Sequence, residues 1–416
     1  MRLCGGGDKL RLTLFGSATS AHLAALKSCY PAQAEAEHCG ISTHRKSVKE
    51  PMDTRYDVVV IGGGQAGLAA GYHLQRAGLR FIIIDAACQI GGSWSQYYES
   101  LRLFSPARYA ALPGFPFGGN PDSYPTRDEV VAYLQAYATY FNLPIVSNTS
   151  IQAVQRRDKH FWSATTAGTV YPSDSLIAAT GSFRTPTIPQ LPGQEHFRGQ
   201  ILHAADYRTP DPFRGKRVIV VGAGNSAVQI GSEVAEVARV TLAVRHPVRF
   251  APQRVLGYDI HHWLDWTRLE YLPWLQDQSA PVLDTGVYQQ ALAANKPDQR
   301  PMFCGFTQDG VWWSGNEYER VDAIIFATGY STRMPYLANL AALDSSGAPL
   351  HHKGISRVVP GLYYVGLSGQ RSFRSATLRG VGADAAYVVA ALQQRCAEHS
   401  DVSAKHTGRC CFASGR

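Results

Sequence analysis

The sequence predicts an α/β fold in which one arrangement of strand, turn and helix occurs twice. Residues 58–68 read VVVIGGGQAGL, and residues 218–230 read VIVVGAGNSAVQI. Each stretch combines β-branched residues typical of a buried parallel strand with a glycine-rich turn and a helix start. Such a turn lets a pyrophosphate approach the backbone and bind the amide groups at the helix N-terminus. We therefore expect two Rossmann-like dinucleotide-binding domains.

The first copy has the features of a site for an unphosphorylated ribose. Gly62, Gly64 and Gly67 meet the spacing G-x-G-x-x-G, and an amphipathic segment leads into the apolar strand RFIIID, which ends in Asp85. A carboxylate at this point can accept both hydrogen bonds of an adenosine ribose diol and would repel a 2′-phosphate. This copy therefore predicts a site for FAD or NAD.

The second copy differs at the positions that select the nucleotide. Gly222 and Gly224 match the spacing, but Ala227 replaces the third glycine. The strand after the helix, VTLAVRHP, ends in Arg245, and Arg249 is a second candidate cation. Because a cation suits a phosphate on the ribose, we interpret this copy as an NADPH site. The alternative is that Arg245 is a solvated residue at a strand end.

The order of the elements predicts how the two domains share the chain. The expected elements are a βαβ unit at 57–100, an amphipathic helix at 127–141 and a short antiparallel insertion at 151–170. Two apolar strands, at 175–181 and 323–330, both end in ATG and are expected to return the chain to the first domain. The prediction is a discontinuous FAD domain, 52–212 plus 321–398, with the NADPH domain inserted at 213–320.

The two ends of the chain differ from its body. The formal charge is +8, and residues 1–51 and 399–416 supply +5 of it, so the charge does not indicate nucleic-acid binding. The N-terminal segment lacks periodicity and is expected to be a disordered or spurious extension, with a targeting segment as the alternative. The C-terminal segment is expected to be a disordered tail.

Several classes of protein have no support in the sequence. The eight cysteines form no C-x-x-C pair, which favours a reducing, cytoplasmic compartment and argues against disulfide frameworks and zinc sites. No apolar run reaches the ~20 residues that cross a bilayer, so no transmembrane segment is expected. The 14 histidines form no H-E-x-x-H, and G-x-S-x-G is absent, so neither a metal site nor an acyl-transfer site is predicted.

Longer motifs resemble class B flavin-dependent monooxygenases. GGSW follows the first unit, and FRGQILHAADY matches F-x-G-x-x-x-H-x-x-x-Y, the family identifying motif, through Phe197, Gly199, His203 and Tyr207. The segments YESLRLFSPAR, SYPTRDEVVAYLQAYA and PGLYYVGL are most similar to plant YUCCA-type enzymes and to bacterial flavoproteins of arsenic-resistance operons. The resemblance covers about residues 56 to 395.

The resemblance implies a mechanism and two cofactors, FAD and NADPH. In this family NADPH reduces FAD, oxygen adds to the flavin to give a peroxyflavin, and retained NADP shields it until a substrate takes one oxygen atom. The cofactor supplies the difficult chemistry, so the protein must hold two rings in register and exclude water. The expected partners are a small-molecule substrate and O2; nitrogen, sulfur, a keto acid and an arsenical stay open. A homodimer is one assembly that this architecture allows.

The candidate cofactor-binding residues lie in the two turns, in GGSW, at the ends of the ATG strands and after the last strand. They are Gly62, Gly64, Gln65, Ala66, Gly67, Asp85, Gly92, Trp94, Thr180, Gly181, Gly222, Gly224, Asn225, Ser226, Ala227, Arg245, Thr328, Gly329, Leu367 and Ser368. Because the flavin carries the chemistry, no catalytic side chain is assigned. Ser105 and His203 are the two candidates, and His203 also has a structural interpretation at the domain junction.

Three positions depart from the family's pattern. Phe104 and Ser105 stand where many members have an asparagine near the flavin. Arg208 follows the identifying motif where Baeyer–Villiger members have a proline after a tryptophan, which makes ketone oxygenation less favoured. Leu367 and Ser368 stand where related reductases have Gly-Asp, so they would approach the flavin through backbone or hydroxyl groups.

Two segments, and the reaction itself, have more than one interpretation. The tryptophan-rich segment 255–276 could line a substrate entrance, touch a membrane surface or, as we prefer, form a packed lid. Three arginines could bind an anion or charge a helix start; they are Arg371, Arg374 and Arg379. The alternatives to a monooxygenase are an NADPH-flavin reductase with a non-thiol electron acceptor and a nucleotide-binding redox sensor linked to transport.

Overall fold

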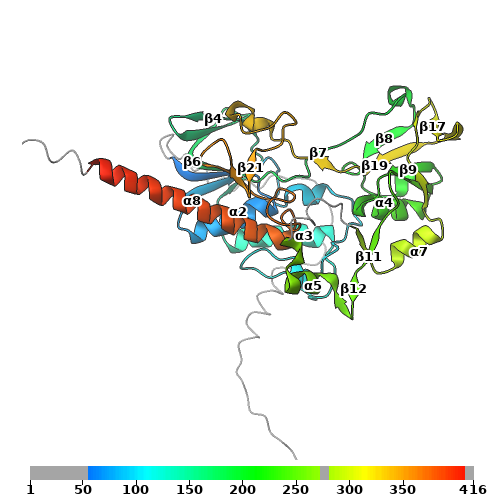
Figure 1. Ribbon diagram of the computed structural model, residues 1–416, viewed down its shortest axis with the longest axis horizontal. Helices are drawn as coiled ribbons and strands as arrows, with labels where there is room; N and C mark the ends of the chain where they lie inside the picture. Colours follow the sequence, from blue (N-terminus) through cyan, green and yellow to red (C-terminus); the bar gives the residue numbers. More distant parts are fainter. Residues whose placement is uncertain (1–54, 272–280, 408–416) are drawn as a thin grey trace, which may run out of the picture. The chain divides into compact units, whose positions relative to one another are not determined.

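The computed structural model describes residues 55–271 and 281–407, all of which belong to one compact unit, residues 51–416. They form two separate, mainly parallel sheets with helices packed on them, which confirms the predicted α/β class (Figure 1). The extension predicted at 1–51 lies outside the described residues. No helix in the described part is long and apolar enough to cross a membrane.

The first sheet has nine strands around a parallel centre. Its strands are β1 (Tyr56–Ile61), β2 (Phe81–Ile84), β3 (Ile145–Val146), β4 (Ile151–Arg157), β5 (His160–Thr165), β6 (Val170–Ala178), β21 (His351–His352), β22 (Ile355–Ser356) and β23 (Leu362–Tyr364). The order is β21-β22-β23-β6-β1-β2-β3, and β4 and β5 extend antiparallel from β6. Because β1 is parallel to both β2 and β6, these three strands end at the same edge. The predicted βαβ unit and antiparallel insertion are confirmed.

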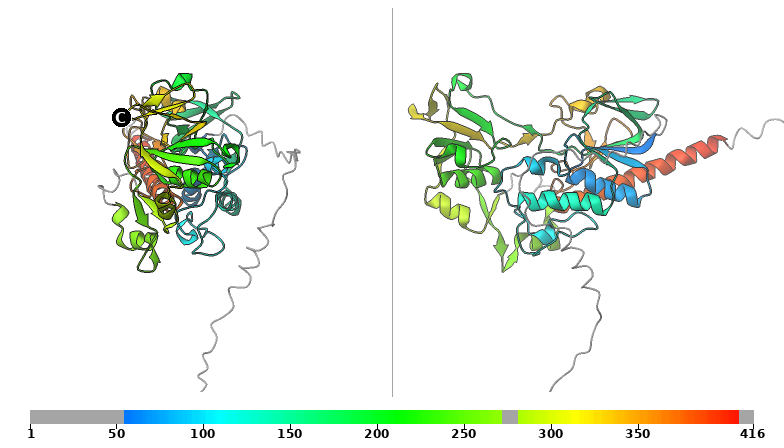
Figure 2. Two further views of the ribbon diagram at one scale, coloured as in Figure 1. Left: turned by 90° about the vertical axis from the view of Figure 1, so that its right-hand side faces the viewer. Right: turned by 180° about the vertical axis from the view of Figure 1, so that it is seen from behind.

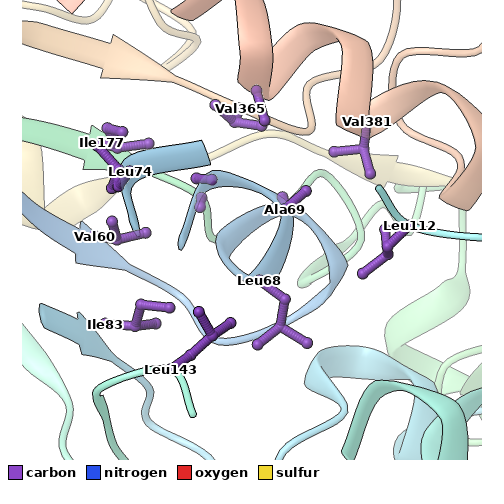
Figure 3. Packing of buried hydrophobic residues seen from close by; sticks show 14 of the residues in the cluster. Val60, Leu68, Ala69, Leu74, Ile83, Leu112, Leu143, Ile177, Val365 and Val381 are labelled. Atoms are coloured by element: carbon purple, nitrogen blue, oxygen red, sulfur yellow. The ribbon is translucent and has the colours of Figure 1, made fainter. Parts of the chain in front are cut away.

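Helices cover one face of the first sheet. They are α2 (Gln65–Arg76), α3 (Arg127–Tyr140) and α8 (Leu378–Thr407), with α2 and α8 next to each other (Figure 2). Successive side chains along a strand point to opposite faces of the sheet, so neighbouring residues pack in different clusters. Val60 and Ile83 pack against Leu68 and Leu74 of α2 (Figure 3), whereas Val59 belongs to a second apolar cluster on the opposite face. Both faces of the central strands are therefore buried.

Local sequence explains the start of α3. The Thr126 hydroxyl accepts a hydrogen bond from the Glu129 N–H, and the Glu129 carboxylate accepts one from the Thr126 N–H at 2.8 Å. This capping box binds two N–H groups that helix geometry leaves free. The helix predicted at 127–141 is confirmed.

Helix α8 corrects the predicted C-terminal boundary. The helix continues to Thr407, so disorder from residue 399 was a wrong prediction for residues 399–407. After Gly382 the next helix-breaking residue is Gly408, and the residues between them contain no proline, so nothing local ends the helix earlier. Residues 408–416 lie outside the described part.

The second sheet has five parallel strands. They are β8 (Gln200–His203), β9 (Arg217–Val221), β10 (Arg239–Val244), β15 (Asp298–Pro301) and β19 (Ala323–Phe326), in the order β15-β10-β9-β19-β8. One face packs against α4 (Asn225–Ala235) and α7 (Val287–Ala293). The other face packs against an antiparallel sheet of β16 (Gly305–Phe306), β17 (Gly310–Trp313) and β18 (Glu317–Arg320).

The position of β19 differs from our expectation. The strand at 323–330 was expected to return the chain to the first domain. Strand β19 itself pairs with β9 on one side and with β8 on the other, and the chain re-enters the first sheet after it, at β21. Because β19 is buried on both faces, as β6 largely is, its apolar pattern does not specify its partner. The second sheet thus draws on residues 200–326, and the domain boundaries stay a prediction.

Short elements complete the described chain. The connections between the sheets pair as β7 (Thr185–Pro186) with β20 (Tyr330–Ser331). The crossover from β10 to β15 contains β11 (Phe250–Pro252), β12 (Arg254–Val255), β13 (Tyr258–Asp259), α5 (Ile260–Thr267) and β14 (Val282–Asp284). The 3₁₀ turns are η1 (Gly92–Gln96), η2 (Ala107–Tyr109), η3 (Gln194–His196), η4 (Asp211–Phe213), η5 (Leu269–Tyr271) and η6 (Pro335–Leu340).

Candidate functional site

Strand β1 leads directly into the first glycine turn, where close packing requires two glycines. A Cβ at Gly62, which has φ +110°, would lie 2.5 Å from the Ala179 carbonyl oxygen. A Cβ at Gly67 would lie 1.8 Å from the Gly62 carbonyl oxygen. Helix α2 therefore begins directly against the strand end, which places its free N-terminal amide groups at this edge of the sheet.

Asp85 lies at the same edge, immediately after β2. Its carboxylate accepts hydrogen bonds from the N–H groups of Gly63 and, at 2.8 Å, Ala87, and only 8% of the residue is exposed. These two bonds fix the carboxylate beside the glycine turn. The geometry suits the predicted hydrogen bonds to a ribose diol, although that role stays a prediction.

A cavity of about 370 Å³ opens beside the first turn. It brings together eleven of the predicted residues: Gly62, Gly64, Gln65, Ala66, Asp85, Gly92, Trp94, Ser105, Thr180, Gly181 and Ser226. Another eleven do not line it: Gly67, His203, Gly222, Gly224, Asn225, Ala227, Arg245, Thr328, Gly329, Leu367 and Ser368. The cavity thus collects the first turn, the GGSW segment and the end of β6, but only Ser226 of the second turn.

A side-chain bridge ties three parts of the cavity wall together. The Gln65 amide group donates to the Ala376 carbonyl at 2.7 Å, and its oxygen accepts a hydrogen bond from the Trp94 indole N–H at 3.2 Å. Trp94 also packs against the apolar core. Gln65 at the start of α2 therefore joins the GGSW segment to the segment that precedes α8.

The second turn is more open than the first. A Cβ at Gly222 would lie 2.5 Å from the Ala327 carbonyl oxygen, but nothing lies within 4 Å of the corresponding position at Gly224. Ala227 is fully buried against the second sheet. Arg245 follows β10 directly and is exposed, which agrees with a phosphate contact and equally with a solvated residue at a strand end. Its role in NADPH binding stays a prediction.

The predicted residues at the end of β19 connect the two sheets. Thr328 donates a hydrogen bond to the Thr187 carbonyl, and the Gly329 carbonyl lies 3.0 Å from Nε2 of His203. Because the Ala205 N–H donates to Nδ1 of His203 at 3.0 Å, Nε2 must carry the proton. Burial lowers the pKa of His203, which favours this neutral form. Both ring nitrogens thus hold the chain at the junction, which favours the structural interpretation.

Tyr207, the last residue of the identifying motif, is buried against α4. Its hydroxyl donates to Oε2 of Glu233 at 2.9 Å, and the Ser100 hydroxyl donates to the same oxygen at 2.7 Å. Burial, together with the Glu233 charge, raises the pKa of Tyr207. The end of the motif is therefore held against α4, the helix that follows the second turn.

The chain reaches the cavity one residue earlier than Leu367. Gly366 lines the cavity, whereas Leu367 is buried in the apolar cluster on the opposite face of the first sheet. The Ser368 N–H donates to the Ser182 hydroxyl at 3.3 Å, and Ser182 itself lines the cavity. Ser368 is exposed and does not line the cavity, and this hydrogen bond connects it to a residue that does.

Sequence reasoning missed most of the apolar wall, including the lining residues at the start of α8. The missed lining residues include Tyr97, Leu101, Leu103, Tyr330, Ala376, Thr377 and Leu378. The last three had a usable signal, because Thr377 precedes an apolar run at the start of α8 and threonine is a preferred residue at helix N-termini. Helix N-termini favour anions, so this signal could have placed the start of α8 beside the nucleotide-binding turns.

The three C-terminal arginines contact carboxylates of the protein. Arg379 binds both oxygens of Glu270, which is 1% exposed, and Arg374 binds the same carboxylate at 3.1 Å. Arg371 lies 3.4 Å from Asp384. Carboxylates of the protein therefore pair with all three arginines, and no bound anion is needed to explain these side chains.

Glu270 belongs to the tryptophan-rich segment, and its burial agrees with a packed lid. Residues 255–271 of that segment are described, and the remainder lies outside the described part. His261 in this segment is buried as well, whereas Trp266 is 74% exposed. Two residues of the segment are therefore fixed to the rest of the molecule.

The comparisons with known proteins extend over both sheets. A family model described as pyridine nucleotide-disulphide oxidoreductase matches residues 59–366. An uncharacterized CzcO-like oxidoreductase of Geobacillus kaustophilus is 34% identical over 340 residues, which cover 80% of this chain and 97% of that protein. The indole-3-pyruvate monooxygenase YUCCA4 of Oryza sativa subsp. japonica is 28% identical, over 81% of this chain and 87% of that protein.

A solved structure has a similar fold. The flavin-containing monooxygenase from Stenotrophomonas maltophilia superposes with a TM-score of 0.73 at 32% identity and covers 82% of this chain and 99% of that chain. Both glycine turns and the whole cavity wall up to Gly366 lie in the range that the family model matches.

Proposed function

Since the chain belongs to the pyridine nucleotide-disulphide oxidoreductase family, and within it to the class B flavin-dependent monooxygenases, we propose which reaction it performs. It would use NADPH to reduce FAD and then insert one oxygen atom of O2 into a small organic substrate or a soft nucleophile. When bound, FAD would supply the oxygen-activating chemistry through the peroxyflavin that the family resemblance implies. The protein's own residues bind the nucleotides, orient them and keep water away.

The observation that carries this proposal is that one cavity borders both nucleotide-binding units. Gly62 and Gly64 of the first turn lie in its wall, and so do Ser226 of the second helix start and Tyr330. Two dinucleotides bound at the two turns can therefore direct their rings into one space. Hydride transfer requires such proximity.

The residues of the first turn fit FAD. The turn leaves no room for a side chain at Gly67, so the backbone amides stay accessible to a diphosphate. The buried carboxylate of Asp85 suits the ribose hydroxyls. Leu101, Leu103 and Phe104 provide an apolar part of the same cavity, which suits a flavin ring and excludes water. A cytoplasmic, homodimeric enzyme is part of the same proposal.

The cysteines favour oxygen insertion over disulfide chemistry. The described residues include Cys88, Cys304 and Cys396, all of them free, and none of the three lines the cavity. A disulfide reductase needs a reactive thiol beside its flavin. This observation supports a monooxygenase even though the family description names disulphide oxidoreductases.

The test is a stopped-flow experiment on the purified full chain. Bound FAD is first confirmed by its absorbance, then reduced with NADPH without oxygen, and then mixed with O2. We expect a transient absorption band that differs from both oxidised and reduced flavin. Flavin that returns at once to the oxidised form would favour the reductase alternative, and flavin that NADPH does not reduce would favour the redox sensor.

A further inference from the structure

Phe104 and Ser105 form one part of the cavity wall. Residues from the crossover that connects β10 to β15 contact this part through a hydrogen bond and a stacked ring. The Gln253 amide group donates to the Phe104 carbonyl at 3.0 Å. The same amide group donates to Oδ2 of Asp259 at 2.7 Å, and Gln253 is only 4% exposed. A buried glutamine whose amide hydrogens are both bound has one orientation, so it holds the Phe104 carbonyl in one place.

Asp259 also orients a ring that packs on Phe104. Its Oδ1 lies 2.6 Å from Nδ1 of His261, which is 1% exposed. The His261 ring stacks on Phe104 at 6.1 Å between centroids with an interplanar angle of 22°, and on Tyr109 at 6.0 Å and 27°. The carboxylate therefore fixes the backbone of Phe104 through Gln253 and its ring through His261.

A third contact holds the segment behind this wall. The Tyr124 hydroxyl donates to Oδ2 of Asp259 at 2.6 Å. The loop that contains Tyr124 accepts hydrogen bonds on both sides of Phe104, because the N–H groups of Leu103 and Ala107 donate to the carbonyls of Pro125 and Ser123, each at 2.8 Å. The side-chain contacts of Asp259 with Gln253, His261 and Tyr124 thus lead to residues 103–107. Its Oδ1 also caps α5 by accepting a hydrogen bond from the His261 N–H at 2.9 Å.

The charge of Asp259 is preserved under working conditions. Burial alone would raise its pKa, but hydrogen bonds from His261, Tyr124 and Gln253 lower the pKa to about 2. The carboxylate is therefore ionised at neutral pH, and its hydrogen bonds are of the stronger, charge-assisted kind.

We propose that Asp259 is a positioning residue for the cavity wall formed by Phe104 and Ser105, so that the β10–β15 crossover sets the position of this part of the wall. This inference rests on the proposed function for its consequence at the flavin. Phe104 and Ser105 stand where many family members have an asparagine near the flavin, so their position bears on the chemistry and on the shape of the substrate space.

The test compares Asp259→Asn with Glu319→Gln. Glu319 is a suitable control because it is a partly buried carboxylate of β18, in the antiparallel sheet packed on the second sheet, where it is bound by Arg217 and Trp313 and does not line the cavity. Both substitutions keep the shape and remove the charge. In cofactor-free protein we expect the Leu103 and Ala107 amides to exchange hydrogen roughly tenfold faster in Asp259→Asn, because charge-assisted bonds are lost, and at the wild-type rate in Glu319→Gln.

The FAD-loaded protein supplies a second readout. In Asp259→Asn the visible absorption band of the flavin should shift, and H2O2 released per NADPH should rise, whereas the KM for NADPH should stay unchanged. Gln253→Met removes the hydrogen bonds of the Gln253 amide group to the Phe104 carbonyl and to Asp259, but leaves the contacts of Asp259 with His261 and Tyr124. It should shift the same band, and it tests the positioning role if Asp259→Asn does not fold.

The outcomes separate the two proposals. Equal exchange at Leu103 and Ala107 in Asp259→Asn and Glu319→Gln would overturn the positioning role, whatever the activity. A wild-type chain that binds no FAD would instead overturn the proposed function, and the exchange measurement on cofactor-free protein would still decide the role of Asp259.

Discussion

The two glycine turns share a backbone plan but differ in what surrounds them. A Cβ at Gly62 or at Gly222 would lie 2.5 Å from the carbonyl oxygen at the end of a neighbouring strand. At the third glycine position the turns diverge, since Gly67 has no space for a methyl group and Ala227 carries one. The first helix therefore packs closer to its strand than the second helix does.

The groups beside the turns differ as well. A Cβ at Gly63 would lie 2.6 Å from Oδ2 of Asp85, whereas the second turn has Ala223 at this position and an exposed Arg245 at its strand end. An enclosed turn beside a fixed carboxylate suits a cofactor that stays bound, and an open turn beside an exposed arginine suits one that exchanges. This contrast supports a resident FAD and a visiting NADPH.

The largest expected effect comes from making the first turn resemble the second. Gly67→Ala forces a methyl group onto the Gly62 carbonyl, so we expect a loss of about 3 kcal/mol in the free energy of unfolding and no bound FAD. Denaturant unfolding and the ratio of FAD to protein measure both. Gly224→Ala is the control in the open turn and should change stability by no more than ~0.5 kcal/mol. Normal FAD content in Gly67→Ala would remove the contrast.

The second-largest effect is expected from substituting Asp85, the carboxylate beside the first turn. Asp85→Asn keeps the shape but weakens the hydrogen bonds to Gly63 and to a ribose diol, so FAD affinity should fall by roughly 100-fold. Titration of the cofactor-free protein with FAD, followed by flavin fluorescence, measures this affinity. The KM for NADPH should not change. If the substitution affects NADPH and not FAD, the assignment of the two turns must be reversed.

A smaller effect is expected at the second turn. Arg245→Ala should raise the KM for NADPH by about tenfold, which corresponds to one charge-assisted contact, and leave the KM for NADH unaltered. Steady-state reduction of the flavin with each nucleotide measures the difference. Arg239→Ala is the matched control, because Arg239 is exposed at the opposite end of β10. Parallel changes for NADPH and NADH would contradict a 2′-phosphate contact.

The smallest effect concerns pH and the junction beside the second turn. Burial lowers the pKa of His203 from 6.5, so the unfolded chain binds more protons below that pH and the stability of wild-type protein should decrease as pH falls below 6.5. His203→Asn keeps an acceptor for the Ala205 N–H and cannot titrate. Measured between pH 5 and pH 8, the free energy of unfolding should depend less on pH in this variant than in the wild type. An unchanged pH dependence would show that other groups cause it.

Local patterns predicted the turns because their causes are local. Strand, glycine spacing and helix start follow each other within about a dozen residues in both copies, and the capping box at Thr126 and Glu129 determines where α3 begins. The same reasoning placed Asp85 at a strand end, and the structure puts it beside the turn. Eleven residues of the predicted site meet in one cavity for this reason.

Pairing and cavity walls were not predictable in the same way. The strand Ala323–Phe326 is apolar on both faces, so its sequence is compatible with either sheet, and only the neighbours β9 and β8 decide its place. The link from Gln253 to Phe104 joins residues that are 149 positions apart. Such contacts form only in the assembled fold, so they cannot be inferred from the spacing of residues along one sequence.

The wall of the cavity extends in sequence from Gly62 to Leu378. On the ribosome, the glycine turn and Asp85 emerge early, whereas the Ala376 carbonyl that binds Gln65 emerges only when synthesis is almost complete. The complete cavity wall therefore exists only after nearly the whole chain has been synthesised, and we expect FAD to bind after that point. A product truncated before Ala376 would leave the ribosome with an open site and with the apolar surface under α8 uncovered, and it would be a substrate for chaperones and proteases rather than a partial enzyme.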